Sequence, residues 1–185
     1  LAGRHNVLNA LAALAAADCA GVPFEAAAQA LDSFAGTGRR SELMGTVGGV
    51  TVINDYAHHP TAIRVTLEAQ RARPGVGAIW AVWQPHTYGR LRALAADFAA
   101  AFASADHVLV TDVYSVREPL TPGLGAPEIA DMIRATGHPD ARWTGSLAET
   151  AAAVVAGVRP GELVLLLSAG DAPQVGRMVL DHLRA

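Results

Sequence analysis

The 185-residue chain is long enough to form one domain of ordinary size, or one domain with part of another. Hydrophobic residues make up 51% of it and charged residues 17%, which excludes a disordered chain and favours a well-buried, alanine-rich α/β protein. The formal net charge is -3 and no basic run offsets it, so we expect a globular protein that does not bind nucleic acid.

The sequence carries no targeting or membrane signal. No apolar run is long enough to cross a bilayer, and the first residues lack the basic-then-apolar pattern of a signal peptide. The single cysteine, Cys19, cannot form an intrachain disulfide, and we expect it to pack within its alanine-rich helix. These features predict a cytoplasmic protein with no membrane partner. Because the chain begins with Leu1 inside a helical pattern, we expect it to be a fragment of a longer protein.

The first part of the chain is helical in pattern. A helix that begins at Arg4 ends near 21–23, and a second helix is predicted over 24–34. After a glycine-rich stretch near 36–40, the apolar runs 43–47 and 50–53 flank two glycines and predict a hairpin. We therefore place a domain boundary in this stretch, with a helical pair over 1–38 and a second domain over 39–185.

Beyond the hairpin, helical and strand patterns alternate along the chain. Helices are predicted over 61–71, where Pro60 can open the helix, and over 91–103, 127–135, 147–155 and 173–183; strands are predicted over 78–83, 107–111, around 142 and over 163–167. This alternation is typical of a mostly parallel sheet with helices on both faces. The sequence thus predicts a Rossmann-like, three-layer α/β domain preceded by a helical pair.

Polar side chains follow four of the predicted strands, at the point where each strand ends. They are Asp55, Tyr56, His58 and His59 after 50–53, Gln84, His86, Tyr88 and Arg90 after 78–83, Asp112, Tyr114, Arg117 and Glu118 after 107–111, and Ser168, Gly170 and Asp171 after 163–167. Because parallel strands end at one edge of a sheet, these clusters predict a cleft there. Arginines suit carboxylate or phosphate, an aspartate suits a ribose hydroxyl or a cation, and histidines bind anions or move protons near neutral pH. The mixture favours a charged, phosphorylated ligand, although Asp and His also cap helices and satisfy turns.

Several common site motifs are absent from the sequence. The glycine-rich segment 45–49 lacks the GxGxxG order and is better explained as a turn, and no GxxxxGK[ST] phosphate loop occurs. The adjacent His58 and His59 lack the spaced ligands of a zinc site, so we assign no metal-binding residue. No GxSxG elbow makes Ser115 or Ser168 a nucleophile, so covalent catalysis has no candidate.

Three segments resemble the motifs of the Mur ligase family in order and spacing: GRHNVLNALAA from Gly3, RRSE from Arg39 and DYAHHP from Asp55. Within that family, WQPHTYGR from Trp83 and DVY from Asp112, leading to Arg117 and Glu118, resemble the members that join L-alanine to UDP-N-acetylmuramic acid. The resemblance covers nearly the whole chain. It implies the C-terminal domain of such a ligase, preceded by the terminal helices of its central ATPase domain.

The resemblance also implies a reaction. Such enzymes are ATP- and Mg²⁺-dependent acid–amino-acid ligases of peptidoglycan synthesis, and hence of cell-wall biogenesis, cell shape and cell division. They convert the muramoyl carboxylate to an acyl phosphate, which the amino group of L-alanine attacks. This chemistry needs positioning and charge stabilisation more than a nucleophilic side chain. The phosphate loop, the UDP-binding region and most Mg²⁺ ligands are expected in the N-terminal and central domains outside this chain, so we expect the fragment alone to be inactive.

Residue roles follow the matched motifs. On the nucleotide side, His5 and Asn6 are expected at the adenine, Arg40 at the phosphates and Asp55 at the ribose, with Tyr56 lining the nucleotide. The residues expected to face the substrates are His58, His59, His86 and Arg90, of which His58, His86 and Arg90 are the catalytic candidates and Arg90 is the candidate for the alanine carboxylate. Since adjacent side chains point in different directions, we expect one of His58 and His59 to enter the cleft.

Simpler roles stay open for several of these residues: Asn6 on an exposed helix face, Arg40 in a solvated linker, Tyr56 in the core, and Arg117 with Glu118 as a surface ion pair.

The chain departs from the family pattern at three places. Asn54 stands where a second acid is expected, Thr87 stands where an arginine is expected, and Ser168 replaces a glycine. The loss of a positive charge at Thr87 leaves the amino-acid preference open. Two alternatives remain: a ligase that reattaches a recycled tripeptide to UDP-N-acetylmuramic acid, against which the segment 84–86 argues, and a nucleotide-binding module without catalysis of its own.

Overall fold

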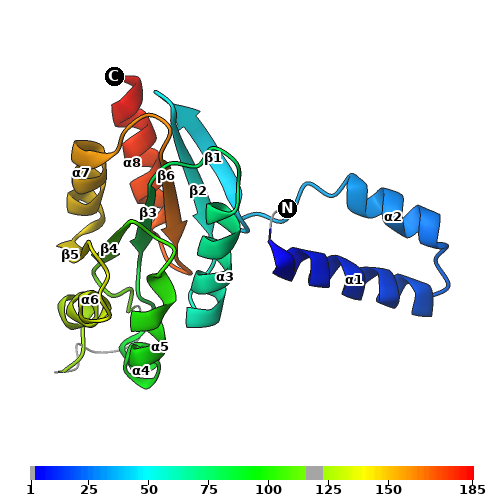
Figure 1. Ribbon diagram of the computed structural model, residues 1–185, viewed down its shortest axis with the longest axis horizontal. Coiled ribbons are helices and arrows are strands. Elements are labelled where there is room, and N and C mark those ends of the chain that lie inside the picture. Colours follow the sequence, from blue (N-terminus) through cyan, green and yellow to red (C-terminus); the bar gives the residue numbers. More distant parts are fainter. Residues whose placement is uncertain (1–2, 116–122) are drawn as a thin grey trace.

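A six-stranded sheet forms the centre of the protein in a computed structural model that describes residues 3–115 and 123–185 (Figure 1). The strand order is β1-β2-β6-β3-β4-β5. β1 and β2 form an antiparallel hairpin around Gly48 and Gly49, whose positive φ angles of 58° and 79° suit the tight turn, and the remaining pairs are parallel. The strands are β1 (Glu42–Val47), β2 (Val50–Asp55), β3 (Ile79–Trp83), β4 (His107–Thr111), β5 (Ala141–Gly145) and β6 (Leu163–Leu167).

Helices cover both faces of the sheet. One face packs against α3 (Pro60–Arg71), α4 (Tyr88–Ala93), α5 (Ala95–Ala99), the 3₁₀ turn η1 (Ala100–Phe102) and α6 (Ala126–Ala135), whereas the other packs against α7 (Leu147–Gly157) and α8 (Pro173–Arg184). Neighbouring strand residues alternate between these layers, as Ile53 and Val52 of β2 do. Because both faces are buried, β6 reads Leu-Val-Leu-Leu-Leu without a polar residue. The predicted three-layer fold is confirmed.

The position of β6 in the sheet determines where a ligand-binding crevice is expected. β6 lies between β2 and β3, and it leads into α8 on one face while β2 and β3 lead into α3 and α4 on the other. Loops that leave adjacent strands toward opposite faces leave a crevice between them. Asp55, Leu167 and Trp83 are paired in register, so the three following turns leave the sheet at one level.

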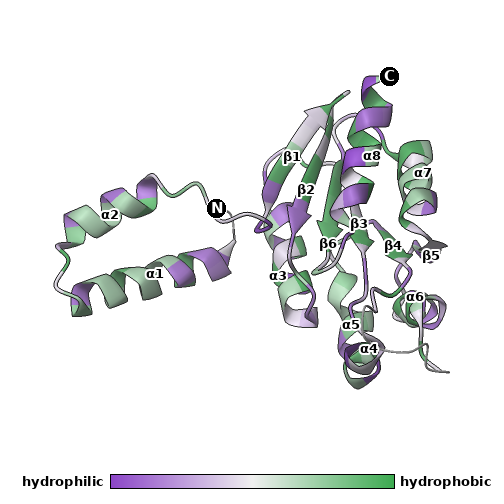
Figure 2. Cartoon of the chain, turned by 180° about the vertical axis from the view of Figure 1, so that it is seen from behind, coloured by the Kyte–Doolittle hydropathy of each residue, from purple (hydrophilic) through white to green (hydrophobic). Residues whose placement is uncertain are grey.

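The first two helices form an arm that extends from the sheet domain (Figure 1). α1 (Arg4–Cys19) and α2 (Phe24–Asp32) lie side by side, and the turn between them includes Gly21 at a φ of 76°. Neither helix has a buried side chain, and apolar residues lie along both of them in Figure 2. The expectation that Cys19 packs within its alanine-rich helix is wrong, because this cysteine is exposed. None of the described helices is both long and apolar enough to span a membrane.

The helix predicted over 91–103 is divided in the structure. It begins earlier, at Tyr88, breaks at Leu94 with φ -120° and ψ 21°, and ends in the 3₁₀ turn η1. Leu94 packs against the core at the break. Alanine-rich sequence favours a continuous helix, but tertiary packing overrides that preference here.

Candidate functional site

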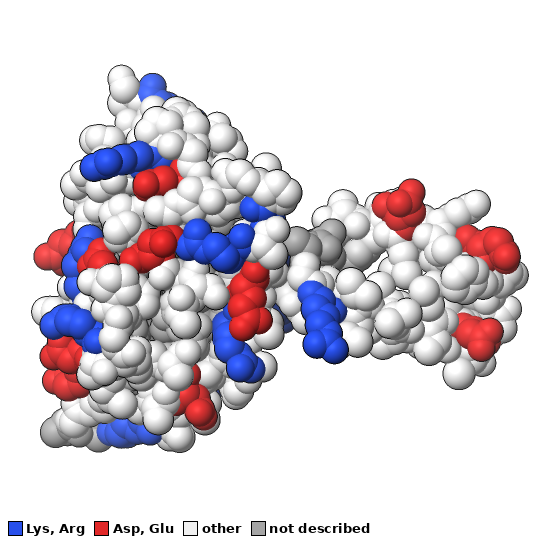
Figure 3. Space-filling model, in the orientation of Figure 1, with Lys and Arg blue, Asp and Glu red and all other residues white. Residues whose placement is uncertain are grey.

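A hollow of about 790 Å³ lies where the arm, the linker and α3 meet. It brings together four of the five residues expected to contact a nucleotide, namely His5, Asn6, Arg40 and Asp55. Its apolar lining includes Leu31 within α2, Phe34 just after α2, and Ala62 and Val65 of α3. Figure 3 shows both basic and acidic side chains near this junction, whereas the outer part of the arm shows acidic ones. The hollow thus offers an apolar wall and a basic group to one ligand.

Asp55 fixes the linker beside the hollow. Its Oδ2 accepts hydrogen bonds from the backbone N–H of Ser41 (2.8 Å) and from the Ser41 hydroxyl (3.3 Å), and its Oδ1 accepts one from the N–H of Ala57 (2.9 Å). A carboxylate can accept about four hydrogen bonds, so capacity for one ligand hydroxyl is left. Ser41 belongs to the RRSE motif, but the motif did not assign it a role.

Arg40 lies between two linker residues whose backbone conformation is unusual. Arg39 and Ser41 on either side of it have positive φ angles of 59° and 47°, which non-glycine residues seldom adopt. The Asp55 contacts hold Ser41 in this conformation, and Arg40 itself is exposed. Strained backbone of this kind persists only where the surroundings enforce it, and it occurs often at functional sites.

Tyr56 lies outside the lining of the hollow and contacts its neighbours instead. The guanidinium carbons of Arg39 and Arg40 lie 4.8 Å and 5.5 Å from the Tyr56 ring centroid, and the His58 ring meets its edge at 5.1 Å. The Nδ1 atom of His58 is 2.8 Å from the Tyr56 carbonyl oxygen. Because a carbonyl only accepts, Nδ1 carries the proton, and in the neutral ring Nε2 is left as an acceptor.

His59 takes a different position from His58. It is exposed and is the N-cap of α3, where its Nδ1 accepts a hydrogen bond from the N–H of Thr61 (3.3 Å). Pro60 follows at the first helical position, as expected. The residue directly before such a proline is the usual cap, so the sequence contained this signal. A contact of His59 with substrate stays a prediction.

Gln84 joins the loop after β3 to the turn after β6. Its buried Oε1 accepts hydrogen bonds from the Ser168 hydroxyl (2.8 Å) and from the N–H groups of Asp171 (3.0 Å) and Ala172 (3.1 Å). Its Nε2 donates to Asp171 Oδ1 at 2.6 Å. A Cβ on Gly170 would lie 2.5 Å from the same Oε1, so only glycine fits there. The sequence placed Gln84 at a strand end but gave it no role, since its partners are more than eighty residues away.

His86 lies on the loop after β3, and Arg90 lies in α4, which follows that loop. His86 forms a parallel bridge with Tyr114, and the two rings stack with centroids 5.4 Å apart. Thr87, the residue after His86, has a φ of 68°. Its N–H donates to the Tyr114 carbonyl oxygen (3.1 Å), and its own carbonyl oxygen accepts the Leu91 N–H (3.1 Å) at the start of α4. Arg90 Nη1 is buried and has no hydrogen-bond partner among the described residues. A buried donor left unpaired is costly, which fits a guanidinium that receives an anion.

A second hollow, of about 430 Å³, opens between the strand-end loops on the α7 side. Its lining is Gln84, Thr111, Asp112, Val113, Tyr114, Ser115, Ser146, Leu147 and Asp171. Neither hollow is lined by His58, His86 or Arg90. His58 and His86 lie on the loops after β2 and β3, Arg90 lies in α4, and β6 pairs between β2 and β3. The expected residues Arg117 and Glu118 lie outside the described part of the chain.

The described residues provide no set of metal ligands. Within 3–115 and 123–185, no three or more His, Cys, Asp or Glu side chains gather as they would around an ion. We therefore derive no step through a metal from these side chains.

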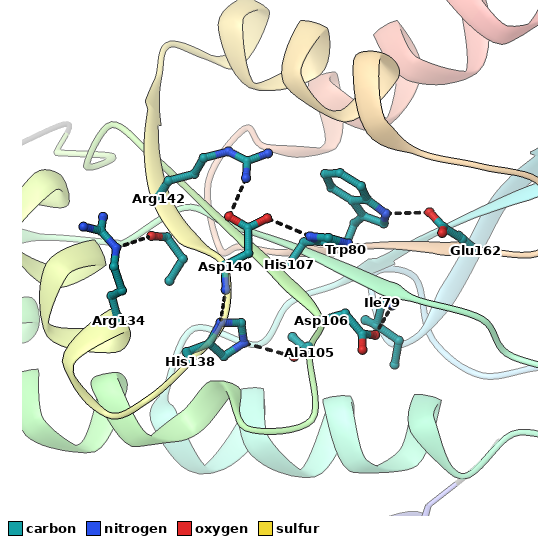
Figure 4. Close-up of polar contacts among 11 residues, drawn as sticks. Ile79, Trp80, Ala105, Asp106, His107, Arg134, His138, Asp140, Arg142 and Glu162 are labelled. Carbon is teal, nitrogen blue, oxygen red and sulfur yellow. Dashed lines mark hydrogen bonds and ion pairs between the residues drawn. The ribbon is translucent and has the colours of Figure 1, made fainter.

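A separate polar cluster lies at the opposite edge of the sheet, meaning the end at which the parallel strands begin. This amino-edge cluster is made of Trp80, Asp106, His107, Asp140, Arg142 and Glu162 (Figure 4). Asp140 accepts from His107 Nδ1 (2.7 Å) and also pairs with Arg142. The Trp80 ring stacks on His107 at 3.9 Å and donates its Nε1–H to Glu162 (2.8 Å). Asp106 pairs with Arg71 and accepts the Ile79 N–H, and the other members contact one another, at the sheet edge away from the expected cleft.

Comparison with known proteins identifies the relatives of this chain. Residues 39–170 match the family model described as "Mur ligase, glutamate ligase domain". The UDP-N-acetylmuramate–L-alanine ligase of Sorangium cellulosum is 44% identical over 91% of this chain, which spans 36% of that relative's length. The crystal structure of the UDP-N-acetylmuramate-alanine ligase of Thermotoga maritima matches 100% of this chain and 39% of its own, with a TM-score of 0.80 and 28% identity. A murein peptide ligase from Psychrobacter arcticus matches 99% of this chain and 38% of its own, with a TM-score of 0.73 and 30% identity.

Proposed function

This chain belongs to the Mur ligase family, and on that premise we propose that it is the C-terminal part of an ATP-dependent ligase that joins L-alanine to UDP-N-acetylmuramic acid in peptidoglycan synthesis. The observation that carries the proposal is the hollow that unites His5, Asn6, Arg40 and Asp55. The named relatives support the substrates, and the residues on the strand-end loops support the chemistry.

The nucleotide side of the proposed site is the hollow between arm and sheet domain. Its volume of about 790 Å³ lies in the range of small-molecule sites, and Phe34 and Leu31 offer an apolar surface to an adenine. The remaining acceptor capacity of Asp55 suits a ribose hydroxyl, and exposed Arg40 suits phosphate oxygens. When bound, Mg²⁺ would neutralise phosphate charge, with its ligands expected mainly outside this chain.

The acceptor side of the proposed site lies on the loops after β2 and β3. The unpaired N–H of Arg90 would hold the alanine carboxylate. The amine nitrogen then forms a bond to the acyl carbon, the carbon–oxygen bond to phosphate breaks, and phosphate leaves. His58 Nε2, left as an acceptor by the Tyr56 contact, would take the proton that the amine loses, while His86 would stabilise charge on the acyl phosphate.

The division of the chain is part of the proposal. Residues 1–38 would belong to the central ATPase domain and residues 39–185 to the C-terminal domain. The support is that neither α1 nor α2 buries a side chain, as expected of helices whose partner lies elsewhere. The central and UDP-binding domains would then be its partners, the isolated chain would not turn over, and the expected cytoplasmic location stays a prediction.

One alternative has a specific observation in its favour. The match to the murein peptide ligase structure fits a ligase that adds a recycled tripeptide in place of alanine. The segment Gln84-Pro85-His86 argues for alanine instead, and a nucleotide-binding module without catalysis is the third possibility.

The deciding experiment measures phosphate release by the natural polypeptide that contains this sequence, with ATP, UDP-N-acetylmuramic acid and either L-alanine or tripeptide. We expect faster turnover with alanine, whereas a preference for tripeptide would select the recycling ligase. Nucleotide binding without phosphate release would select the module.

In the same assay His58→Ala should lower kcat strongly, Asp55→Ala should mainly raise the KM for ATP, and Arg64→Ala on the exposed face of α3 should change neither.

A further inference from the structure

Arg39 connects three segments that meet at the carboxyl ends of the strands. Its Nη2 donates to the carbonyl oxygens of Ser168 (2.8 Å) and Gly170 (3.0 Å) in the turn after β6. Its guanidinium lies over the Tyr56 ring after β2, and its own carbonyl accepts the Tyr56 N–H at 2.7 Å. The linker and the turns after β2 and β6 are thus held by one residue.

The backbone of Arg39 indicates that the side chain is needed at this place. Its φ of 59° is in the left-handed region, where glycine would be easier to accommodate. The Arg39 N–H donates to Glu42 Oε2 (2.8 Å), and together with the Tyr56 contact this holds the strained conformation. Lysine would keep the charge but could not combine a planar stack on Tyr56 with the fixed hydrogen-bonding geometry of a guanidinium.

Arg39 also lies between the two sides of the proposed site. The next residue, Arg40, lines the large hollow. On the other side, the turn that Arg39 holds is bonded to Gln84 through Ser168 and Asp171. Gln84 begins the loop that carries His86 and leads into α4, where Arg90 lies. A continuous set of hydrogen bonds therefore runs from the nucleotide-side linker to the acceptor-side loop.

We propose that Arg39 is a positioning residue, which fixes the turn after β6, and through Gln84 the loop of His86 and the start of α4 with Arg90, relative to the linker that presents Arg40. Its consequence for turnover rests on the function proposed above. Its structural consequence does not, so the two can be tested apart.

The first experiment is NMR of this chain with Arg39→Lys. We expect the amides of Gly170, Asp171 and Ala172 to exchange with solvent about tenfold faster, and the ring signals of His86 to shift. The reason is that the carbonyl oxygens of Ser168 and Gly170 lose the guanidinium donor that holds the turn. Arg177→Ala, on the exposed face of α8, is the matched control and should leave both unchanged. Unchanged exchange and unchanged His86 signals in Arg39→Lys would refute the proposal.

The second experiment measures both KM values in the natural polypeptide. Arg39→Lys should raise the KM for L-alanine about tenfold and change the KM for ATP by less than about twofold. A purely structural role would reduce the active fraction and lower kcat while leaving both KM values in place, and an equal rise in both would assign Arg39 to the nucleotide; either result contradicts positioning. If the unaltered polypeptide forms no product, the proposed function fails, and the NMR result alone decides the role of Arg39.

Discussion

The two edges of the sheet use similar side chains in opposite ways. At the amino edge, Asp140 is paired with both His107 and Arg142, and Trp80 bonds to Glu162. At the carboxyl edge, a buried N–H of Arg90 has no partner among the described residues. Charges that satisfy one another stabilise a fold, whereas a buried donor left open costs stability, a cost that a bound ligand would offset. The difference is the physical basis for proposing the site at the carboxyl edge.

The acids near the amino edge show the effect of that pairing. Partial burial alone would raise the pKa of Asp140, but hydrogen bonds from His107 and Arg142 and their positive charges outweigh it and lower the pKa below its usual 3.8. Burial would likewise raise the pKa of Asp106, but the Ile79 N–H and the hydrogen bond and charge of Arg71 lower it. Both acids are therefore more stable as carboxylates in the folded protein.

The strongest test of the contrast between the two edges is a substitution of Arg90. We expect Arg90→Leu to lower turnover of the natural polypeptide at least about 100-fold, while its thermal midpoint stays the same or rises because an unpaired buried donor is removed. Phosphate-release kinetics and a melting curve check the two parts. Arg64→Leu on exposed α3 is the control. A large fall in the melting temperature with normal turnover would make Arg90 structural.

Two glycines test whether the edges serve different purposes. A Cβ at Gly157 would lie 2.4 Å from the Trp80 ring, and one at Gly170 would lie 2.5 Å from Gln84 Oε1. Each change to alanine should cost about 1–3 kcal/mol of folding free energy in urea unfolding, because a packed group must move. Gly170→Ala should in addition lower turnover roughly tenfold, while Gly157→Ala leaves turnover per folded molecule unchanged. Equal loss of turnover in both would remove the distinction between the edges.

A smaller effect is expected from Asp140→Asn, which keeps the shape of the side chain but weakens its bonds to His107 and Arg142. Urea unfolding should show a loss of about 1–2 kcal/mol, with turnover unchanged. Asp131→Asn is the matched control, because its pair with Arg134 is exposed on α6 and should contribute less than about 0.5 kcal/mol. A loss of turnover in Asp140→Asn would show that the amino-edge cluster acts on the site.

The smallest effect concerns pH. Because the pKa values of Asp106 and Asp140 are lowered on folding, their contribution is complete above the usual value of 3.8 and is lost as the pH falls through the lowered folded values. The stability difference between the protein and Asp140→Asn should therefore shrink as the pH falls below about 4. Urea unfolding at several pH values measures it. A difference that grows below about pH 4 would contradict the pairing.

The strands were predictable because local pattern and final environment agree. Apolar runs such as 163–167 become buried strands whichever neighbours they pair with, so β4 and β6 lie where the pattern placed them and β3 begins one residue later. The break at Leu94 was not predictable, because the alanine-rich sequence around it favours a continuous helix and only packing interrupts it. The exposure of Cys19 had the same cause, since apolar composition does not say whether a partner is present.

The candidate site divides in the same way. His5, Asn6, Arg40 and Asp55 were named from motifs and line one hollow, and their roles stay predictions. Arg39 and Gln84 carried no assigned role, because their partners lie on a turn far along the chain and are partly backbone carbonyls, which any residue supplies. Contacts of this kind leave no spacing in the sequence.

The position of β6 also constrains how the protein folds. β6 is the last strand of the described sheet in chain order, yet β2 and β3 each pair with it and not with one another. Until residues 163–167 are available, β1–β2 and β3–β4–β5 can form only as two separate half-sheets with open edges. Pairings such as Thr51 with Leu163 are long in sequence and so are slow to form. During synthesis from the N-terminus, the sheet therefore closes last at its centre, and the earlier half-sheets are the species most exposed to aggregation.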